Sequence, residues 1–312
     1  MTPGSPAKPL IPEILENRGR GVLPAGGSGP PRSRRRRLRD NKNWMPSQLN
    51  LAAIRSALIG TRFAAHLHLF ASVSSTNSLL LASAAEGAPE GTVFLADEQT
   101  AGRGRSDHSW HSASGEGLYL SALVKPSLPL RDALLLSLAT GVAAAHAIEE
   151  VTNLKIDLRW PNDLMLAGKK LGGILVETAS ETGADAPLRY AVIGIGINVH
   201  QRAFPPELTA LATSLDLETD TRATSREALL IALLRALDLE LTHLENRSDQ
   251  NALLARFAER SSWVRGKRVH VPEQGSYTGT TAGLDSRGFL LVDADDGSQR
   301  TVLSGGVREL AA

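Results

Sequence analysis

A glycine- and arginine-rich stretch, GRGRSDHSW at residues 102–110, is the first place where residue types and spacing suggest chemistry. Glycine permits unusual backbone angles and close approach of the main chain, and arginine offers paired donors to a carboxylate or a phosphate. The stretch lacks the Lys-Ser/Thr ending of a Walker loop. Trp110 adds one large aromatic ring, which suits stacking on a flat base or closing a lid. Considered alone, GRGR is equally consistent with a plain solvated turn.

A polar triplet, Ser75-Thr76-Asn77, lies where a strand pattern gives way to a helix pattern. A hydroxyl or amide at such a junction accepts a free backbone N–H and caps the helix. The same three side chains could hydrogen-bond a small polar ring at the mouth of a sheet. By itself the triplet favours the cap.

A proline turn followed by a lysine- and glycine-containing strand forms the third group. RWPND (159–163) predicts a fixed turn that carries an amide and a carboxylate. In KKLGGILVE (169–177), side chains alternate between the two faces of the strand, so only one of Lys169 and Lys170 can face inward. A lysine-rich hairpin turn is an equally good interpretation of this segment alone.

The fourth segment, IGIGINV (193–199), has two glycines that alternate with isoleucines inside a strand pattern. Such glycines open one face of a sheet to a ligand or to another backbone. The pattern is not GxGxxG and no helix follows closely, so a dinucleotide-binding Rossmann site fits poorly.

Alternating helix and strand patterns position these four segments. We predict helices over 48–59, 75–88, 129–151, 225–245 and 249–260, and strands over 67–73, 91–99, 117–125, 155–160, 171–178 and 188–199. After Trp263, short β-rich runs separated by Gly, Asp and Ser predict a small β-barrel. The expected organisation is a tail at 1–44, a main domain at 45–262 and a barrel at 263–312.

The composition is that of a globular protein rather than a membrane or secreted one. Hydrophobic residues make up 42% and charged residues 21% of 312, and there is no cysteine. The absence of cysteine excludes disulfides, thiolate metal sites and thiol catalysis, and suits the cytoplasm. The longest apolar run, Leu134–Ala147, is too short and too interrupted to span a membrane.

Residues 1–44 carry a net charge of +7, from ten basic and three acidic side chains, whereas the rest of the chain carries −6, which gives the whole chain +1. Their Pro, Gly and Arg content predicts disorder. RSRRRR (32–37) could be a nucleic-acid or targeting patch, or part of a solvated tail. A translation start at Met45 is a further alternative.

Taken in order, the four segments resemble the biotin protein ligases, or biotin–[acetyl-CoA carboxylase] ligases. The family pattern of STN, QxxGRGRxxxxW, WPND with KKxxGILxE, and GxGINV is complete here, and the resemblance covers roughly 70–312. It implies an α+β fold: a mixed sheet flanked by helices, like class II synthetases, with an SH3-like C-terminal barrel. The residues ahead of the main domain are too few and too polar for the winged helix of some members, so we expect no DNA-binding domain.

The resemblance also implies the reaction. Biotin and ATP form biotinoyl-5′-adenylate, and the biotinyl group then passes to one lysine of a biotin carrier domain, as in acetyl-CoA carboxylase. Mg²⁺ accompanies ATP, and neither a protein-built metal cage nor a tightly bound prosthetic group is expected. No membrane partner is expected, and a homodimer is left open.

Roles carry over to matching positions. The resemblance implies contacts to biotin from Ser75, Thr76, Gln99, Gly102, Arg103 and Gly173, contacts to ATP from Arg105, Trp110, Asn162, Lys170 and Asn198, and catalytic roles for Lys170, its partner Arg105 and Asp163.

Two rival functions remain open at this point. A lipoate or octanoate ligase shares the fold, but the STN and GRGR segments offer polar contacts that a linear acyl chain cannot use. A nucleic-acid-binding protein working through the arginine-rich tail is the alternative from another class.

Overall fold

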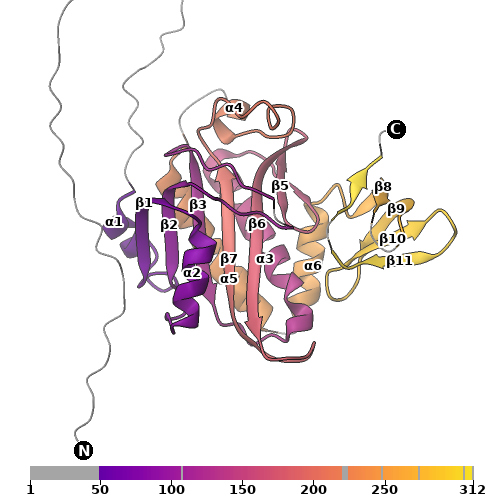
Figure 1. Cartoon of the computed structure of the whole chain (residues 1–312), viewed down its shortest axis with the longest axis horizontal. Helices are drawn as coiled ribbons and strands as arrows, with labels where there is room; N and C mark the ends of the chain where they lie inside the picture. The colour runs from indigo at the N-terminus through magenta and orange to yellow at the C-terminus, as the bar shows by residue number, and fades with distance from the viewer. Residues whose placement is uncertain are drawn as a thin grey trace, which may run out of the picture. The chain divides into compact units, whose positions relative to one another are not determined.

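The structure is a computed structural model and describes residues 49–106, 108–219, 224–246, 249–272, 275–304 and 306–310 (Figure 1). The predicted tail at 1–44 lies outside these residues. The helices are α1 (Leu51–Ala57), α2 (Thr76–Ala85), the 3-10 helix η1 (Leu130–Asp132), α3 (Leu134–Thr152), α4 (Leu215–Thr219), α5 (Arg226–Glu245) and α6 (Gln250–Glu259). The strands are β1 (Leu67–Val73), β2 (Val93–Gln99), β3 (Gly117–Val124), β4 (Asp157–Arg159), β5 (Asp163–Leu166), β6 (Lys169–Ser180), β7 (Leu188–Asn198), β8 (Arg265–Val271), β9 (Tyr277–Leu284), β10 (Leu290–Ala294), β11 (Gln299–Val302) and β12 (Arg308–Glu309).

The main sheet has seven strands in the order β1-β2-β3-β7-β6-β5-β4. Only β1 and β2 run parallel, and the remaining neighbours are antiparallel, so the sheet is mixed. β7 is the central strand of the seven, and its two neighbours, β3 and β6, pair with it over almost its whole length. The predicted α+β architecture with a mixed sheet is confirmed.

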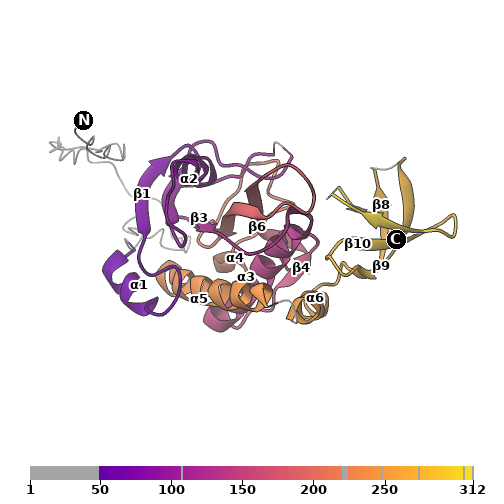
Figure 2. The ribbon, with the colours of Figure 1, turned by 90° about the horizontal axis from the view of Figure 1, so that it is seen from below.

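Helices cover both faces of this sheet (Figure 2). On one face α3 packs against the sheet and against α5 and α6, and a large cluster of aliphatic side chains from these elements forms the core. On the other face α2 packs through Leu80 and Ala84 on Phe94, Leu123 and Val192. The segment Leu130–Thr152 is long and apolar enough to cross a membrane, but 72% of its 18-residue apolar window is buried inside the protein. It is the central helix of the core.

The C-terminal strands form a separate antiparallel sheet in the order β11-β10-β9-β8-β12. Alternate positions are buried along β9, with half-buried residues between them. This sheet confirms the expected small SH3-like barrel. The domain limits at 262/263 stay a prediction, with β8 beginning at Arg265.

The sequence patterns do not predict β5 or α4. Both elements are only four or five residues long, which is too short to show a periodicity. β5 starts directly after the WPN turn, and the next turn has positive φ angles of 50° at Ala167 and 75° at Gly168, as a tight two-residue hairpin requires. The resulting hairpins place Asp163 opposite Gly173 in β6.

Candidate active site

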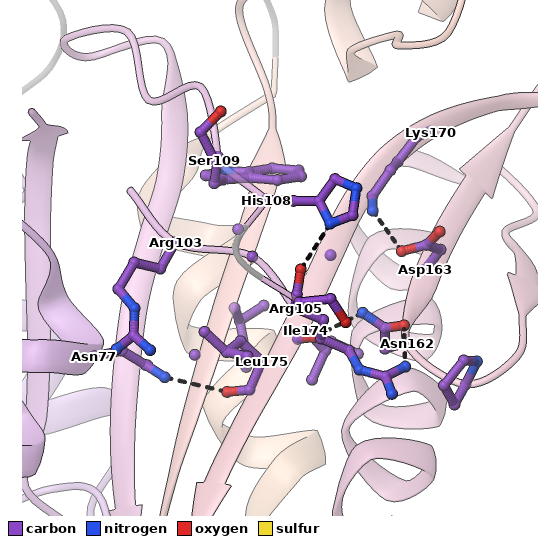
Figure 3. A pocket seen from close by; sticks show the side chains of 18 of the residues that line it. Asn77, Arg103, Arg105, His108, Ser109, Asn162, Asp163, Lys170, Ile174 and Leu175 are labelled. Atoms are coloured by element: carbon purple, nitrogen blue, oxygen red, sulfur yellow. Dashed lines mark hydrogen bonds and ion pairs between the residues drawn. The ribbon is translucent and has the colours of Figure 1, made fainter. Parts of the chain in front are cut away.

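A cavity of about 390 Å³ opens where α2 begins and where the glycine- and arginine-rich loop crosses β6 and β7. Its walls come from segments that are far apart in the sequence (Figure 3). The lining residues include Ser75, Thr76, Asn77, Gln99, Arg103, Arg105, Trp110, Arg159, Asn162, Asp163, Lys170, Gly173, Leu175, Gly194, Gly196 and Arg308.

The polar triplet at the start of α2 forms one end of the cavity. Ser75 caps the helix, with its Oγ accepting from Ser78 N at 3.4 Å. Thr76 donates its backbone N–H and its hydroxyl to Gln99 Oε1, at 2.9 and 3.1 Å, and Gln99 Nε2 donates to Ser112 Oγ at 3.0 Å. The triplet therefore acts both as a cap and as a cavity wall, and Thr76 and Gln99 lie together as the resemblance implies.

Asn77 explains one of the alternating glycines in β7. A Cβ at Gly194 would lie 2.3 Å from Asn77 Oδ1, so only glycine leaves room for this buried amide. Asn77 Oδ1 accepts from Ser121 Oγ at 2.6 Å, and its Nδ2 donates to Glu177 Oε2 at 2.9 Å. Ser121 Oγ also lies 2.8 Å from Thr76 Oγ1. Ser121 was not predicted as a site residue, because its single hydroxyl lies inside a strand of otherwise apolar appearance.

The glycine- and arginine-rich loop is tied to β6 at its start. Arg103 makes a two-point contact with Glu177, with Nη1–Oε2 and Nη2–Oε1 distances of 3.1 and 2.9 Å. Within the loop, Trp110 N donates to Gly102 O at 2.8 Å and Gly104 N donates to His108 O at 2.7 Å. The loop is thus a small hairpin whose start Arg103 anchors to β6. Glu177 was not singled out from the sequence, although it ends the KKxxGILxE pattern.

Glu177 tests this anchor. We expect Glu177→Gln to weaken binding of biotin, the ligand that the family resemblance implies, by about two- to fivefold, because the ion pair is partly exposed and such pairs contribute at most about 1 kcal/mol. Glu181→Gln, at an exposed position just after β6, is the matched control and should leave the Kd unchanged. Calorimetric titration with biotin measures both, and equal values for the two variants would contradict an anchoring role.

Trp110 lines the cavity, and its ring explains the second alternating glycine of β7, Gly196. A Cβ at Gly196 would lie 2.5 Å from the indole Nε1, and one at Gly173 would lie 3.3 Å from the same ring. Within the described part of the chain the indole N–H is buried without a hydrogen-bond partner. The indole ring therefore packs against the flat surface that Gly173 and Gly196 create, and its N–H has no acceptor among the described residues.

Lys170 faces the cavity and Lys169 faces solvent, as strand alternation predicted for one of the two. Lys170 Nζ is 2.5 Å from Asp163 Oδ1 and 5.8 Å from the centre of the Trp110 ring. A bulge in β6 skips Leu171 in the pairing with β5, so Lys170 and Gly173 share a face although they are three residues apart. The contact with Asp163 differs from the implied partnership with Arg105.

Arg105 instead contacts the proline turn, where its Nη1 donates to Asn162 Oδ1 at 3.2 Å. Asn162 is held in place by β6, because its Nδ2 donates to Ile174 O at 2.9 Å and its own carbonyl accepts from Ile174 N at 2.9 Å. Figure 3 shows these side chains beside the Lys170–Asp163 pair.

The barrel completes this end of the cavity with Arg308 and its neighbours. Arg159 joins the two sheets, since its Nη2 donates to Val307 O at 2.9 Å and its guanidinium lies 4.2 Å from the centre of the Trp263 ring. Trp160 Nε1 likewise donates to Gly288 O at 2.8 Å.

Positive charge dominates the cavity wall. Among the described lining residues Asp163 is the sole carboxylate, and the cations are Arg103, Arg105, Arg159, Lys170 and Arg308. Such a wall attracts anions and concentrates them. Elsewhere in the described ranges, no group of three or more His, Asp or Glu side chains that could hold a metal ion is present.

Two predicted site residues lie outside this cavity. Asn198 is 4% exposed, and its Nδ2 donates to Thr213 O at 2.9 Å. Gly102 lines an adjacent hollow between the loop and β6. Their contacts with ATP and biotin stay predictions.

Comparison with known proteins agrees with this architecture. The model of the Biotin/lipoate A/B protein ligase family matches residues 69–198, and that of the Biotin protein ligase C terminal domain matches 265–307. The chain is 34% identical to the biotin–[acetyl-CoA-carboxylase] ligase of Mycobacterium tuberculosis, over 83% of this chain and 94% of that one. The chain belongs to the biotin protein ligase family. The family resemblance drawn from the sequence is confirmed, and the protein is a ligase.

Two further relatives match most of the length of the ligase. It is 34% identical to the bifunctional ligase/repressor BirA of Bacillus subtilis, over 82% of this chain and 78% of that one. The biotin protein ligase of Aquifex aeolicus, solved in complex with biotin and ATP, superposes with a TM-score of 0.67 at 29% identity, covering 80% of this chain and all of that one. Members of the family are therefore ligases that act on biotin, and one of them has been solved with biotin and ATP bound.

Proposed function

We propose that this ligase joins biotin to one lysine of a biotin carrier domain in two steps within the described cavity. The observation that carries the proposal is the division of the cavity. Ser75, Thr76 and Gln99 line one end, and the Lys170–Asp163 pair lies with the Arg105–Asn162 pair toward the other end (Figure 3). This arrangement suits a substrate that carries a polar ring at one end and a carboxylate and phosphates at the other.

In the first step a carboxylate oxygen of biotin attacks the α-phosphorus of ATP, and pyrophosphate leaves. Two anions must approach each other, so cations that face the reacting atoms lower the barrier. Lys170, paired with Asp163, is a cation that faces the cavity. Arg105, fixed by Asn162, supports the phosphate side. Mg²⁺ enters with the triphosphate as part of the substrate.

The neutral end of the cavity holds the ureido ring of biotin. Thr76 and Gln99 already hydrogen-bond to each other, so a ring that exchanges those bonds for its own needs little rearrangement. Ser75 and the main chain of Gly102, Arg103 and Gly173 supply further contacts. A lipoate or octanoate chain has no ureido ring to make these hydrogen bonds, so it gains less from this end of the cavity, which disfavours both acids.

In the second step the amine of the carrier lysine attacks the carbonyl carbon of the adenylate, and AMP leaves. The attacking amine must lose a proton, and Asp163 is the carboxylate that lines the cavity beside the reacting atoms. Trp110 and the glycine- and arginine-rich loop exclude water from the reactive anhydride until the carrier arrives. Trp110 also contacts the nucleotide.

The proposal extends to partners and setting. The carrier is a biotin carboxyl carrier domain of the acetyl-CoA carboxylase type, and the reaction takes place in the cytoplasm. A homodimer, the role of 1–44 and the lack of a DNA-binding domain stay predictions, because the residues ahead of 49 lie outside the described part.

One assay tests the function. ATP-dependent transfer to a biotin carrier domain is measured with biotin, lipoate and octanoate in parallel. We expect transfer of biotin alone, with activity kept after deletion of 1–44. Preferred transfer of lipoate would establish the rival ligase. Loss of activity on deletion, together with loss of nucleic-acid binding, would favour the rival role of the tail.

Loop closure gives a separate prediction. Most side chains between Arg103 and His111 are exposed or half-buried, so the amides of 102–114 should exchange readily in the free protein. Biotin with ATP should slow this exchange, because the bound adenylate supplies new contacts. Exchange rates that stay the same at saturating ligand would contradict the lid.

A further inference from the structure

The segment after β7 holds the main chain of Lys170 from outside the cavity. Lys170 N donates to Leu211 O at 2.8 Å, and Thr213 N donates to Lys170 O at 3.0 Å. Ala212 thereby forms a one-residue parallel bridge with Lys170. We call residues 199–216 the strap. All of them are described, and none lines the cavity.

The strap is needed because β7 ends too early to support Lys170. β6 and β7 pair from Gly172 onwards, so Lys170 extends beyond the last pair, Gly172 with Ile197. The bulge at Leu171 lies in the same place on the other side of β6. Without the strap, the backbone N–H and C=O of Lys170 would lose the partners that fix its position.

Buried side chains hold the strap at its centre. Gln201 Nε2 donates to Asn198 Oδ1 at 3.1 Å and to the Tyr119 hydroxyl at 3.0 Å, while Gln201 O accepts from Ser214 Oγ at 2.6 Å. Asn198 Nδ2 completes the cluster by donating to the carbonyl of Thr213. These five residues are each less than 5% exposed. Because water cannot replace these bonds, the cluster defines one position of the strap.

A second contact closes the ends of the strap. His200 Nδ1 lies 3.0 Å from Asp216 Oδ2, with both side chains buried, and Asp216 N donates to Val199 O at 2.9 Å. The two ends of the segment are therefore held together beside β7.

Tyr119 connects the strap with the end of the glycine- and arginine-rich loop. Its hydroxyl donates to Ala113 O at 3.1 Å and accepts from Gln201. Burial raises the pKa of the Tyr119 phenol, so the hydroxyl keeps its proton and serves both partners. One side chain thus lies between the strap and the end of the glycine- and arginine-rich loop.

We propose that Gln201 is a positioning residue that acts through the strap on Lys170. The inference rests on the proposed function, in which Lys170 supports adenylate formation. Gln201 touches no substrate. Loss of its two donated bonds leaves buried acceptors without partners, so the strap settles differently and the backbone of Lys170 moves with it. A misplacement of about 1 Å at a reacting group can cost about a hundredfold in rate.

The test is Gln201→Met, which keeps the length of the side chain and removes both donors. We expect adenylate formation, measured by single-turnover kinetics and ATP–pyrophosphate exchange, to slow by about ten- to a hundredfold while the KM for biotin changes by less than about twofold. In a Lys170→Ala background the same change should cause no further loss, because the two residues act in series. Glu240→Gln is the matched control, since it removes the charge from a partly buried ion pair with Arg256 between α5 and α6 and should leave the rate unchanged.

Two results would overturn the positioning role: an unchanged rate in Gln201→Met, or a further loss of the same size in the Lys170→Ala background. If Gln201→Met does not fold, the same two measurements are made on Ser214→Ala, which removes the bond from Ser214 Oγ to Gln201 O. A wild-type protein that forms no adenylate would instead contradict the proposed function, and this inference with it.

Discussion

Lys170→Ala is expected to slow formation of the biotinyl adenylate by about a hundred- to a thousandfold, the usual loss when a preorganised charge-stabilising group is removed. Lys170 is the lysine that faces the cavity, and it approaches Asp163 at 2.5 Å. Its removal leaves two reacting anions without this cation and leaves Asp163 unpaired beside them. ATP–pyrophosphate exchange in the presence of biotin measures this step directly.

Lys169→Ala is the matched control for this prediction. Lys169 precedes Lys170 in β6 but is exposed, so its loss should change the exchange rate only slightly. A large loss in Lys169→Ala with a small one in Lys170→Ala would mean that the catalytic lysine is the other residue. The Asp163 contact would then have no role in adenylate formation.

Arg105→Gly is expected to separate formation of the adenylate from its retention. Arg105 lines the cavity and donates to Asn162 from the glycine- and arginine-rich loop. A charge-assisted contact from it to the adenylate phosphate would contribute about 1.5–3 kcal/mol, or about ten- to a hundredfold in retention. The variant should therefore still form adenylate but release it, so that lysines on unrelated proteins become biotinylated.

Biotin incorporation into serum albumin, measured beside pyrophosphate exchange, tests this prediction. Ser106→Gly is the control for backbone freedom, because Ser106 has a φ of 50° and glycine adopts this conformation easily. We expect little bystander labelling from the control. Equal labelling by both variants would assign the leak to a looser backbone. Loss of exchange with wild-type labelling would place Arg105 in the chemical step instead.

The sequence alone determined the set of chemical parts and the side of the sheet that most of them face. Strand alternation predicted that one of Lys169 and Lys170 faces inward, and alternating glycines predicted an open face on β7. Both follow from the two-residue period of a strand, which is a local property. Four motifs in order were also sufficient to place the chain in its family, because each motif is short and has a defined spacing.

Only the tertiary structure decided which parts meet. Lys170 pairs with Asp163 because a short strand and a bulge bring them together, and neither leaves a periodic signal in the sequence. Arg103 and Glu177 are 74 positions apart in the sequence, and only the order of the strands brings them into contact. The buried cluster around Gln201 is likewise assembled from three separate segments. Local spacing fixes the face on which a side chain lies, but its partner depends on strand order, register and packing, which arise from the whole chain.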